Sequence, residues 1–308
     1  MAMRLKTVGP GRGAAWVADG LRLYMKRPMA FTGMFAAFLL AALVAAIVPG
    51  VGWLLQMMLV PMLSLGFMVA SQSALLQGPV KLSHFIEPLQ GAPAQRRALV
   101  ILCVLYGLAA AAILWSVDRI ADGGYTHLFE LMRQTPAPLH EIDALFVERS
   151  MSAAALFGSA ALTLLTIPFW HAPALVHWGH QGAMQALFSS TLAVWRCRGA
   201  FVVYGLTWFT MMLSLGMISA LFFGLLGMGQ LGSTLMLPLG LFLSTLFYVT
   251  LIFSFNDSFA HQPDGQAALP APPDSRDPPG PSDPPDPPET PGGAAPPAGA
   301  DKDVTRSE

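Results

Sequence analysis

Six long apolar segments dominate the pattern of hydrophobic and polar positions along this chain. None of them contains Asp, Glu, Lys or Arg, and each is close to the ~20 residues that an α-helix needs to cross a bilayer core. They run roughly over residues 31–48, 51–75, 98–117, 153–176, 200–225 and 232–254. Because backbone polar groups inside lipid must be bonded internally, the pattern predicts an all-α, polytopic bundle of six transmembrane helices.

An amphipathic helix is expected before the first span, over residues 13–27. Its apolar positions recur at helical spacing, at Trp16, Val17, Leu21 and Tyr24. We interpret it as an interfacial helix in which Trp16 sits at the level of the lipid headgroups. Arg22, Lys26 and Arg27 would then meet anionic headgroups.

The charges of the loops predict an orientation. Three segments on one side of the predicted bundle carry eleven Lys or Arg residues and two acidic ones, Asp19 and Glu87. The longest loop on the opposite side, residues 118–152, has six acids and three arginines, and its pattern predicts two short amphipathic helices on either side of Pro136 and Pro138. The positive-inside rule places both termini in the cytoplasm.

A weak internal repeat divides the spans into three hairpins. Lys26–Phe31 enters span one as Arg196–Phe201 enters span five, and a fainter copy surrounds Gln95–Ala98. We therefore predict three hairpins, each introduced by a cytoplasmic interfacial amphipathic helix. Small residues at four-residue spacing predict close helix packing, namely Gly216, Ala220 and Gly224 in span five and Gly107 with Ala111 in span three.

Composition changes abruptly near the C-terminus. The whole chain is 54% hydrophobic and 11% charged, but from Gln262 onward it consists largely of Pro, Ala, Gly, Asp and Ser. Such a segment cannot bury enough apolar surface to order itself. The predicted organisation is a leader with an interfacial helix over 1–30, a membrane domain over 31–255, and a disordered, acidic, Pro-rich cytoplasmic tail over 256–308.

The densest unusual chemistry lies at the end of span four. Residues 163–180 hold two prolines five residues apart, two tryptophans and three histidines. A proline within a helix removes a donor and clashes with a carbonyl of the preceding turn, so a kink is expected here. The candidate functional residues are Pro168, Trp170, His171 and Pro173, because an ionisable group inside a span is a functional hypothesis by default.

Other chemistry is poorly supported by the sequence. A metal or proton-relay site could be drawn from His171, His177, His180, His84 and Cys197, but neutral histidines at a helix end are ordinary interfacial residues. The chain has no phosphate-binding glycine loop, zinc-protease motif or nucleophile elbow. We expect no catalytic residue, no metal, no cofactor and no nucleic-acid partner.

The chain resembles an uncharacterised family of proteobacterial six-span inner-membrane proteins. The resemblance is carried by Trp16 through Arg27–Pro28, by the aromatic-x-Ala-Pro-Ala-Leu-Val run Trp170–Val176, and by the segment Ala186–Phe201. It is also distantly similar to the membrane domains attached to glycerophosphodiester phosphodiesterases. The departure at Cys197–Arg198 leaves any role of that pair in the family open. The resemblance implies a bacterial inner-membrane location and no established activity.

Three functional hypotheses follow, of which the third is a lipid-active enzyme with a site built from scattered Ser, His and Trp residues. The first is a non-enzymatic envelope or lipid-associated membrane component whose partners are anionic lipid headgroups, bound by Arg22, Lys26, Arg27, Arg196 and Arg198. The second is a transporter or channel for a small or amphipathic solute, which uses the kink in span four and requires a cavity at membrane depth. The sequence specifies neither a homo-oligomer nor a membrane-protein partner.

Overall fold

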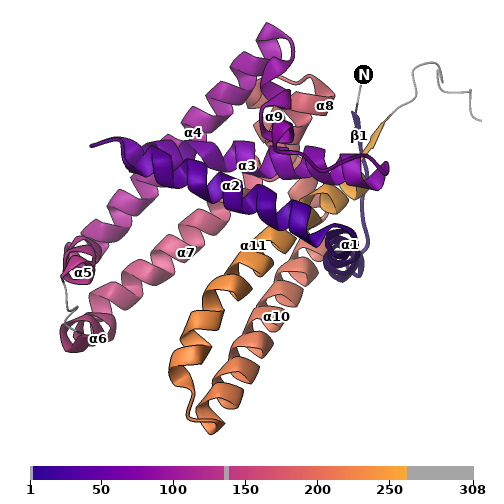
Figure 1. Ribbon diagram of the computed structural model, residues 1–308. Helices are drawn as coiled ribbons and strands as arrows, with labels where there is room; N and C mark the ends of the chain where they lie inside the picture. The colour runs from indigo at the N-terminus through magenta and orange to yellow at the C-terminus, as the bar shows by residue number, and fades with distance from the viewer. Residues whose placement is uncertain (1–2, 135–138, 262–308) are drawn as a thin grey trace, which may run out of the picture. The chain divides into compact units, whose positions relative to one another are not determined.

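Helices make up almost all of the chain that the computed structural model describes, which is residues 3–134 and 139–261 (Figure 1). The α-helices are α1 (Arg12–Lys26), α2 (Pro28–Ala46), α3 (Gly52–Leu75), α4 (Pro93–Ile120), α5 (Gly124–Arg133), α6 (Leu139–Val147), α7 (Arg149–Phe169), α8 (Ala172–Gly179), α9 (Ala183–Arg196), α10 (Arg198–Leu225) and α11 (Gly229–Ser258). Two 3-10 turns, η1 (Leu82–Phe85) and η2 (Glu87–Gln90), lie between α3 and α4. The strands β1 (Met3–Leu5) and β2 (Phe259–His261) form one antiparallel ladder with Arg4 opposite Ala260.

Six of these helical segments are long and apolar enough to cross a membrane, as the sequence predicts. They are α2, α3, α4, α7 together with α8, α10, and α11. The all-α polytopic fold is therefore confirmed. α11 continues to Ser258, past residue 255, where the membrane domain was expected to end. The predicted tail from residue 262 onward lies outside the described residues, as do Pro136 and Pro138.

The spans pair into three hairpins, α2 with α3, α4 with α7, and α10 with α11. The segment that introduces each hairpin packs on the hairpin before it in cyclic order. α1 lies on α10 and α11, η1 lies on α3, and α9 lies on α7 and α8. The second hairpin is introduced by the two 3-10 turns rather than by an amphipathic helix, which differs from the prediction, because Pro88 and Gly91 interrupt that segment.

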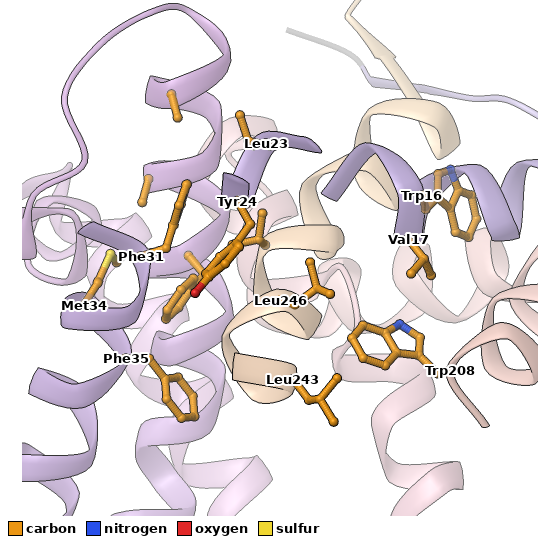
Figure 2. Packing of buried hydrophobic residues seen from close by; sticks show 14 of the residues in the cluster. Trp16, Val17, Leu23, Tyr24, Phe31, Met34, Phe35, Trp208, Leu243 and Leu246 are labelled. Atoms are coloured by element: carbon orange, nitrogen blue, oxygen red, sulfur yellow. The ribbon is translucent and has the colours of Figure 1, made fainter. Parts of the chain in front are cut away.

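The helix before the first span is part of the core. The expectation that Trp16 meets the lipid headgroups is wrong, since its side chain is fully buried within the protein and its ring lies 5.3 Å from that of Phe201. Figure 2 shows Trp16, Val17 and Tyr24 of α1 pointing into the same cluster as Leu243 and Leu246 of α11. An amphipathic pattern can cover a protein surface as well as a lipid surface, and here it covers the third hairpin.

Two glycines permit this close docking of α1. A Cβ on Gly13 would meet the backbone of Ala200 and Tyr204 in α10, and a Cβ on Gly20 would meet Thr250 in α11. The two glycines are seven residues apart, so they lie on one face of the helix. α1 therefore rests against the third hairpin at almost backbone-to-backbone distance.

The prediction that small residues allow close helix packing is right in one span and wrong in another. Gly107 in α4 faces Met58 of α3, which confirms the predicted close approach of a neighbouring helix. The prediction for Gly216 and Gly224 is wrong, because a Cβ on either would meet no atom within 4 Å. Large apolar side chains on the same half of α10, such as Leu221 and Leu225, are likewise exposed, so no other helix of the described chain packs on this surface.

The loop opposite the basic segments folds as expected. α5 and α6 are the two short amphipathic helices predicted there, and they follow α4 and precede α7 (Figure 1). Tyr125 and Leu128 pack on a small cluster formed by Val117, Ala121 and Met151. The loop thus has its own core, separate from the two larger clusters at the other end of the spans.

Candidate functional site

The fourth span is broken where the sequence concentrates its prolines. α7 ends at Phe169 with Pro168 inside its last turn, and α8 begins at Ala172 with Pro173 in its first turn. Proline is favourable in the first turn of a helix, where its missing N–H would have no partner, and unfavourable further inside. The two prolines therefore end one helix and begin the next, with Trp170 and His171 at the break.

Ser190 of α9 supplies hydrogen-bond partners for two backbone groups at this break. Its hydroxyl accepts a hydrogen bond from the backbone N–H of His171 at 3.0 Å and donates one to the carbonyl of Ile167 at 3.2 Å. Ser190 is fully buried, so neither group could turn to water instead. The sequence indicates that freed backbone groups need partners here, but it does not single out a serine 19 residues away.

His171 lies in an aromatic pocket and lines none of the cavities described below. Its side chain is fully buried, with ring centroids 6.0 Å from Phe201, 5.7 Å from Phe255 and 5.5 Å from Phe259. Within the described part of the chain, neither ring nitrogen has a hydrogen-bond partner. This environment favours a neutral imidazole that fills space, because burying an unpaired charge is costly.

Trp170 is the candidate residue that reaches the cavities. Its indole N–H donates to the hydroxyl of Ser254 in α11 at 3.1 Å, and its ring meets Phe201, Tyr204 and Phe247 edge to face. The ring lines both a large groove and a small inner cavity. The broken span thus places the Trp170 ring between the two spaces.

The large groove lies between the second and third hairpins. It has a volume of about 690 Å³ and is lined by side chains of α7, α9, α10 and α11. Its wall is mostly apolar, and the hydroxyls of Thr163 and Thr166 donate to carbonyls of their own helix. The charged residue of the lining is Arg198, whose guanidinium lies 5.6 Å from the ring centroid of Trp195.

The inner cavity has a volume of about 130 Å³ and lies among α3, α4, α7 and α11; it is half open, to about the same degree as the groove. It shares Thr166, Trp170, Phe247 and Tyr248 with the groove. Its remaining lining includes Pro61, at a proline within α3. A cavity at membrane depth lined by the fourth span is therefore present, although His171 does not line it.

The basic residues predicted to meet lipid fall into two groups. Arg27 donates to the backbone carbonyls of Gly78 and Gln77, so it holds the loop after α3. Arg22 is paired with Asp19 at 2.8 Å. Lys26, Arg196 and Arg198 are exposed. Among these described residues, Arg27 has a structural role inside the protein. Lys26, Arg196 and Arg198 are better placed to bind lipid headgroups.

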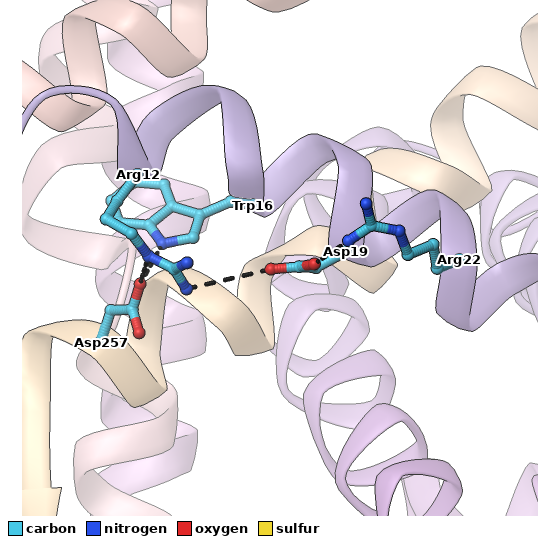
Figure 3. Close-up of polar contacts among 5 residues, drawn as sticks. All are labelled: Arg12, Trp16, Asp19, Arg22 and Asp257. Carbon is cyan, nitrogen blue, oxygen red and sulfur yellow. Dashed lines mark hydrogen bonds and ion pairs between the residues drawn. The ribbon is translucent and has the colours of Figure 1, made fainter.

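The N-terminal helix is held by an ion network that the sequence does not predict. Asp257, near the end of α11, accepts hydrogen bonds from Trp16 Nε1 at 2.7 Å and from Arg12 Nε at 2.8 Å. Figure 3 shows the carboxylate beneath α1, with Arg12 reaching on toward Asp19. The hydrogen bond that Arg12 donates to Asp257 raises the pKa of Arg12 above its ordinary value. These contacts join α1 to the end of the last span.

The other histidines are not brought to His171. His84 Nδ1 lies 2.9 Å from a carboxylate oxygen of Glu87, and His177 Nδ1 accepts a hydrogen bond from the Gln95 amide at 3.0 Å. Both line a cavity of about 300 Å³ beside the α3–η1 loop, which polar and apolar side chains line together. Cys197 lies elsewhere, with its thiol 3.4 Å from the carbonyl of Lys6. Among residues 3–134 and 139–261, no three His, Cys, Asp or Glu side chains are placed to hold a metal ion.

Comparison with known proteins supports the membrane assignment. The chain is 29% identical over 269 residues to a protein of Burkholderia thailandensis described as a probable inner membrane protein, and the match covers 87% of this chain and 98% of that relative. No protein-family model matches the chain, and no solved structure is significantly similar to it. The six apolar helices and this similarity together identify an integral, multi-pass membrane protein.

Proposed function

We propose that this membrane protein acts without catalysis in the bacterial inner membrane, as a lipid-associated component of the envelope. Both termini would lie in the cytoplasm, as the positive-inside rule predicts. Its ligands would be anionic lipid headgroups of the cytoplasmic leaflet. Each nearby Lys or Arg contributes roughly 1 kcal/mol to such binding.

The observation that carries the proposal is the gathering of basic segments at one end of the spans. Arg27 touches the loop after α3, and Lys6 touches Cys197 at the junction of α9 and α10. The N-terminal segment, the α3–α4 loop and the α9–α10 junction are therefore neighbours. Arg196 and Arg198 are exposed there, beside the mouth of the groove.

The test is the anionic lipid that the full-length protein retains through purification, measured by native mass spectrometry. The double variant Arg196→Gln/Arg198→Gln removes two exposed charges from the basic end. Its matched control, Arg133→Gln/Arg149→Gln, removes two arginines from the opposite end. The proposal requires less retained lipid in the first variant and wild-type retention in the control. Equal retention in all three proteins would refute it.

We also propose a distant kinship with the membrane domains attached to glycerophosphodiester phosphodiesterases. It is supported by the run Trp170–Val176 and by the order of introducing segment, span and span in α1–α3 and α9–α11. A structure of such a domain should superimpose on residues 12–258 with the same cyclic packing of introducing segments. A different order of packing would remove this part of the proposal.

A transporter of amphipathic solutes is the second candidate, and the lining residues shared by the groove and the inner cavity favour it. Both spaces share Trp170 and Tyr248, so a ligand in the groove could move inward if Trp170 turned. Proteoliposomes with fluorescent phospholipid in both leaflets, treated with an impermeant quencher, separate the two functions. Loss of only the outer-leaflet signal is expected for a lipid-associated component. Complete loss would establish transbilayer movement.

A further inference from the structure

The three hairpins form a cycle with one interface left open. The first and second hairpins meet where α3 packs on α4, and the third and first meet where α11 packs on α2 and α3. The equivalent contact between the second and third would join α7 to α10, but within the described chain these two helices form no extended interface. The groove of about 690 Å³ occupies that position.

We propose that this groove is a binding site for one anionic phospholipid of the cytoplasmic leaflet. An acyl chain would lie between α7 and α10, and the phosphate would meet the guanidinium of Arg198. This inference rests on the proposed orientation and lipid association, and it adds a defined site with a single occupant.

The length of the groove fits one leaflet. Its lining along α10 extends from Arg198 to Met212, which is roughly 21 Å at 1.5 Å per residue. Half of a bilayer core is about 15 Å, and the headgroup region adds several more. The groove therefore reaches from the membrane surface to about the midplane, which suits an acyl chain held by its headgroup at one end.

The polarity of the lining also changes along this length. Arg198 and Trp195 lie at the first turn of α10 and the end of α9, whereas Phe247, Leu243 and Met212 lie deeper. Arginine is well matched to a phosphate, to which it can donate two parallel hydrogen bonds. Tryptophan is typical of the headgroup level. A charged, aromatic mouth above an apolar slot is complementary to an anionic amphiphile.

The presence of lipid in the groove can be tested by filling the groove with a larger side chain at Gly205. Gly205 lines the groove in the middle of α10, and a Cβ added there would meet no atom within 4 Å. Gly205→Leu would therefore add a side chain at the groove, and its Cβ would meet no neighbouring atom. Gly216→Leu is the matched control, because Gly216 lies on the same helix, is equally unobstructed and is outside the groove.

The experiment titrates the full-length protein in non-ionic detergent with phosphatidylglycerol and counts bound lipids by native mass spectrometry. The wild type and Gly216→Leu should bind one lipid in preference to further ones. Gly205→Leu should lose this first lipid, with a drop of about tenfold or more in affinity. Arg198→Gln should weaken it roughly fivefold, since 1 kcal/mol is lost, and phosphatidylcholine should bind more weakly to the wild type than phosphatidylglycerol.

Each outcome decides between the groove and the more general proposal. If Gly205→Leu binds the first lipid as tightly as the wild type, the groove site is overturned. If Arg196→Gln/Arg198→Gln nevertheless retains less lipid, the proposal that the basic end binds headgroups stands without the groove site. Thermal unfolding of each variant identifies any that misfolds. Arg198→Gln alters an exposed side chain, so it keeps the test decisive if Gly205→Leu fails to fold: unchanged phosphatidylglycerol affinity in Arg198→Gln would then overturn the site.

Discussion

The indole N–H of Trp16 donates to the carboxylate of Asp257 across 2.7 Å, although the two residues are 241 positions apart in the chain. This hydrogen bond places the first helix on the last span. It also explains how a tryptophan with a polar N–H can be fully buried, since buried donors need an acceptor.

Removing the Asp257 carboxylate should destabilise the protein. Asp257→Ala leaves the buried N–H of Trp16 without an acceptor and frees Arg12, so we expect a loss of about 1 to 3 kcal/mol in unfolding free energy. Thermal unfolding in detergent would measure it. Asp19→Ala is the control, because its ion pair with the exposed Arg22 should contribute well under about 1 kcal/mol. An equal effect of both changes would contradict the role given to Asp257.

A single methyl group at Gly20 should weaken the docking of α1. Gly20→Ala directs a Cβ into Thr250, and overpacking of this kind costs about 1 to 3 kcal/mol. Gly33→Ala in α2 adds the same methyl group where no atom lies within 4 Å, so it should be neutral or stabilise by up to about 1 kcal/mol. Limited proteolysis of the N-terminal segment and thermal unfolding provide the two readouts. Equal protease resistance of both variants would argue against tight docking.

The hydroxyl of Ser190 should stabilise the break in the fourth span. Ser190→Ala removes the acceptor for the His171 N–H and the donor to the Ile167 carbonyl, both in a buried place. The expected cost is about 1 to 3 kcal/mol. Ser159→Ala removes an exposed hydroxyl that bonds only to its own helix, and it should change the unfolding midpoint little. The prediction fails if Ser190→Ala unfolds at the wild-type temperature.

Phenylalanine should be tolerated in place of His171. Neither ring nitrogen has a partner in the described structure, so an apolar ring of similar shape loses no hydrogen bond and avoids a buried polar group. The thermal midpoint of His171→Phe should be unchanged or higher. His177→Phe, by contrast, loses the bond from Gln95 and should be less stable. A His171→Phe protein that folds normally but loses retained lipid would restore a functional role for this histidine.

The orientation can be tested with introduced cysteines at equally exposed sites. Met25 in α1 is 63% exposed and Phe129 in α5 is 67% exposed. With both termini in the cytoplasm, a membrane-impermeant maleimide should label Phe129→Cys in spheroplasts and should reach Met25→Cys only after permeabilisation. The parent chain, with Cys197 buried and Cys103 within a span, is the background control. The reverse labelling pattern would overturn the orientation.

The spans could be predicted because lipid imposes a strong and local rule. A charge-free apolar segment of about 20 residues has few alternatives, and all six such segments are helices here. α5 and α6 could be predicted for a related reason, since their apolar positions follow helical periodicity. Both rules operate within a few turns of one helix, so a single sequence contains all the information they need.

The environment of α1 could not be predicted, because it depends on contacts remote in sequence. An apolar stripe with Trp16 at its centre suits a bilayer surface and a protein groove equally well. The difference lies in Gly13, Gly20 and Asp257, and their meaning appears only when α10 and α11 are adjacent. The sequence could suggest a cavity beside the fourth span, but it could not place the groove between α7 and α10, because the groove arises from an interface that the hairpins do not form.

The dependence of α1 on Asp257 sets an order of events during synthesis. Arg12 leaves the ribosome 245 residues before its partner, which at 5 to 20 residues per second is a delay of roughly 10 to 50 seconds. During that interval α10 and α11 do not yet exist, and the apolar face of α1 has only the membrane surface to cover it. We therefore expect α1 of the nascent chain to lie on the membrane surface, as the sequence predicts, until the third hairpin is present. Once the last span is inserted, Asp257 and the third hairpin are available, and we expect α1 to dock against them.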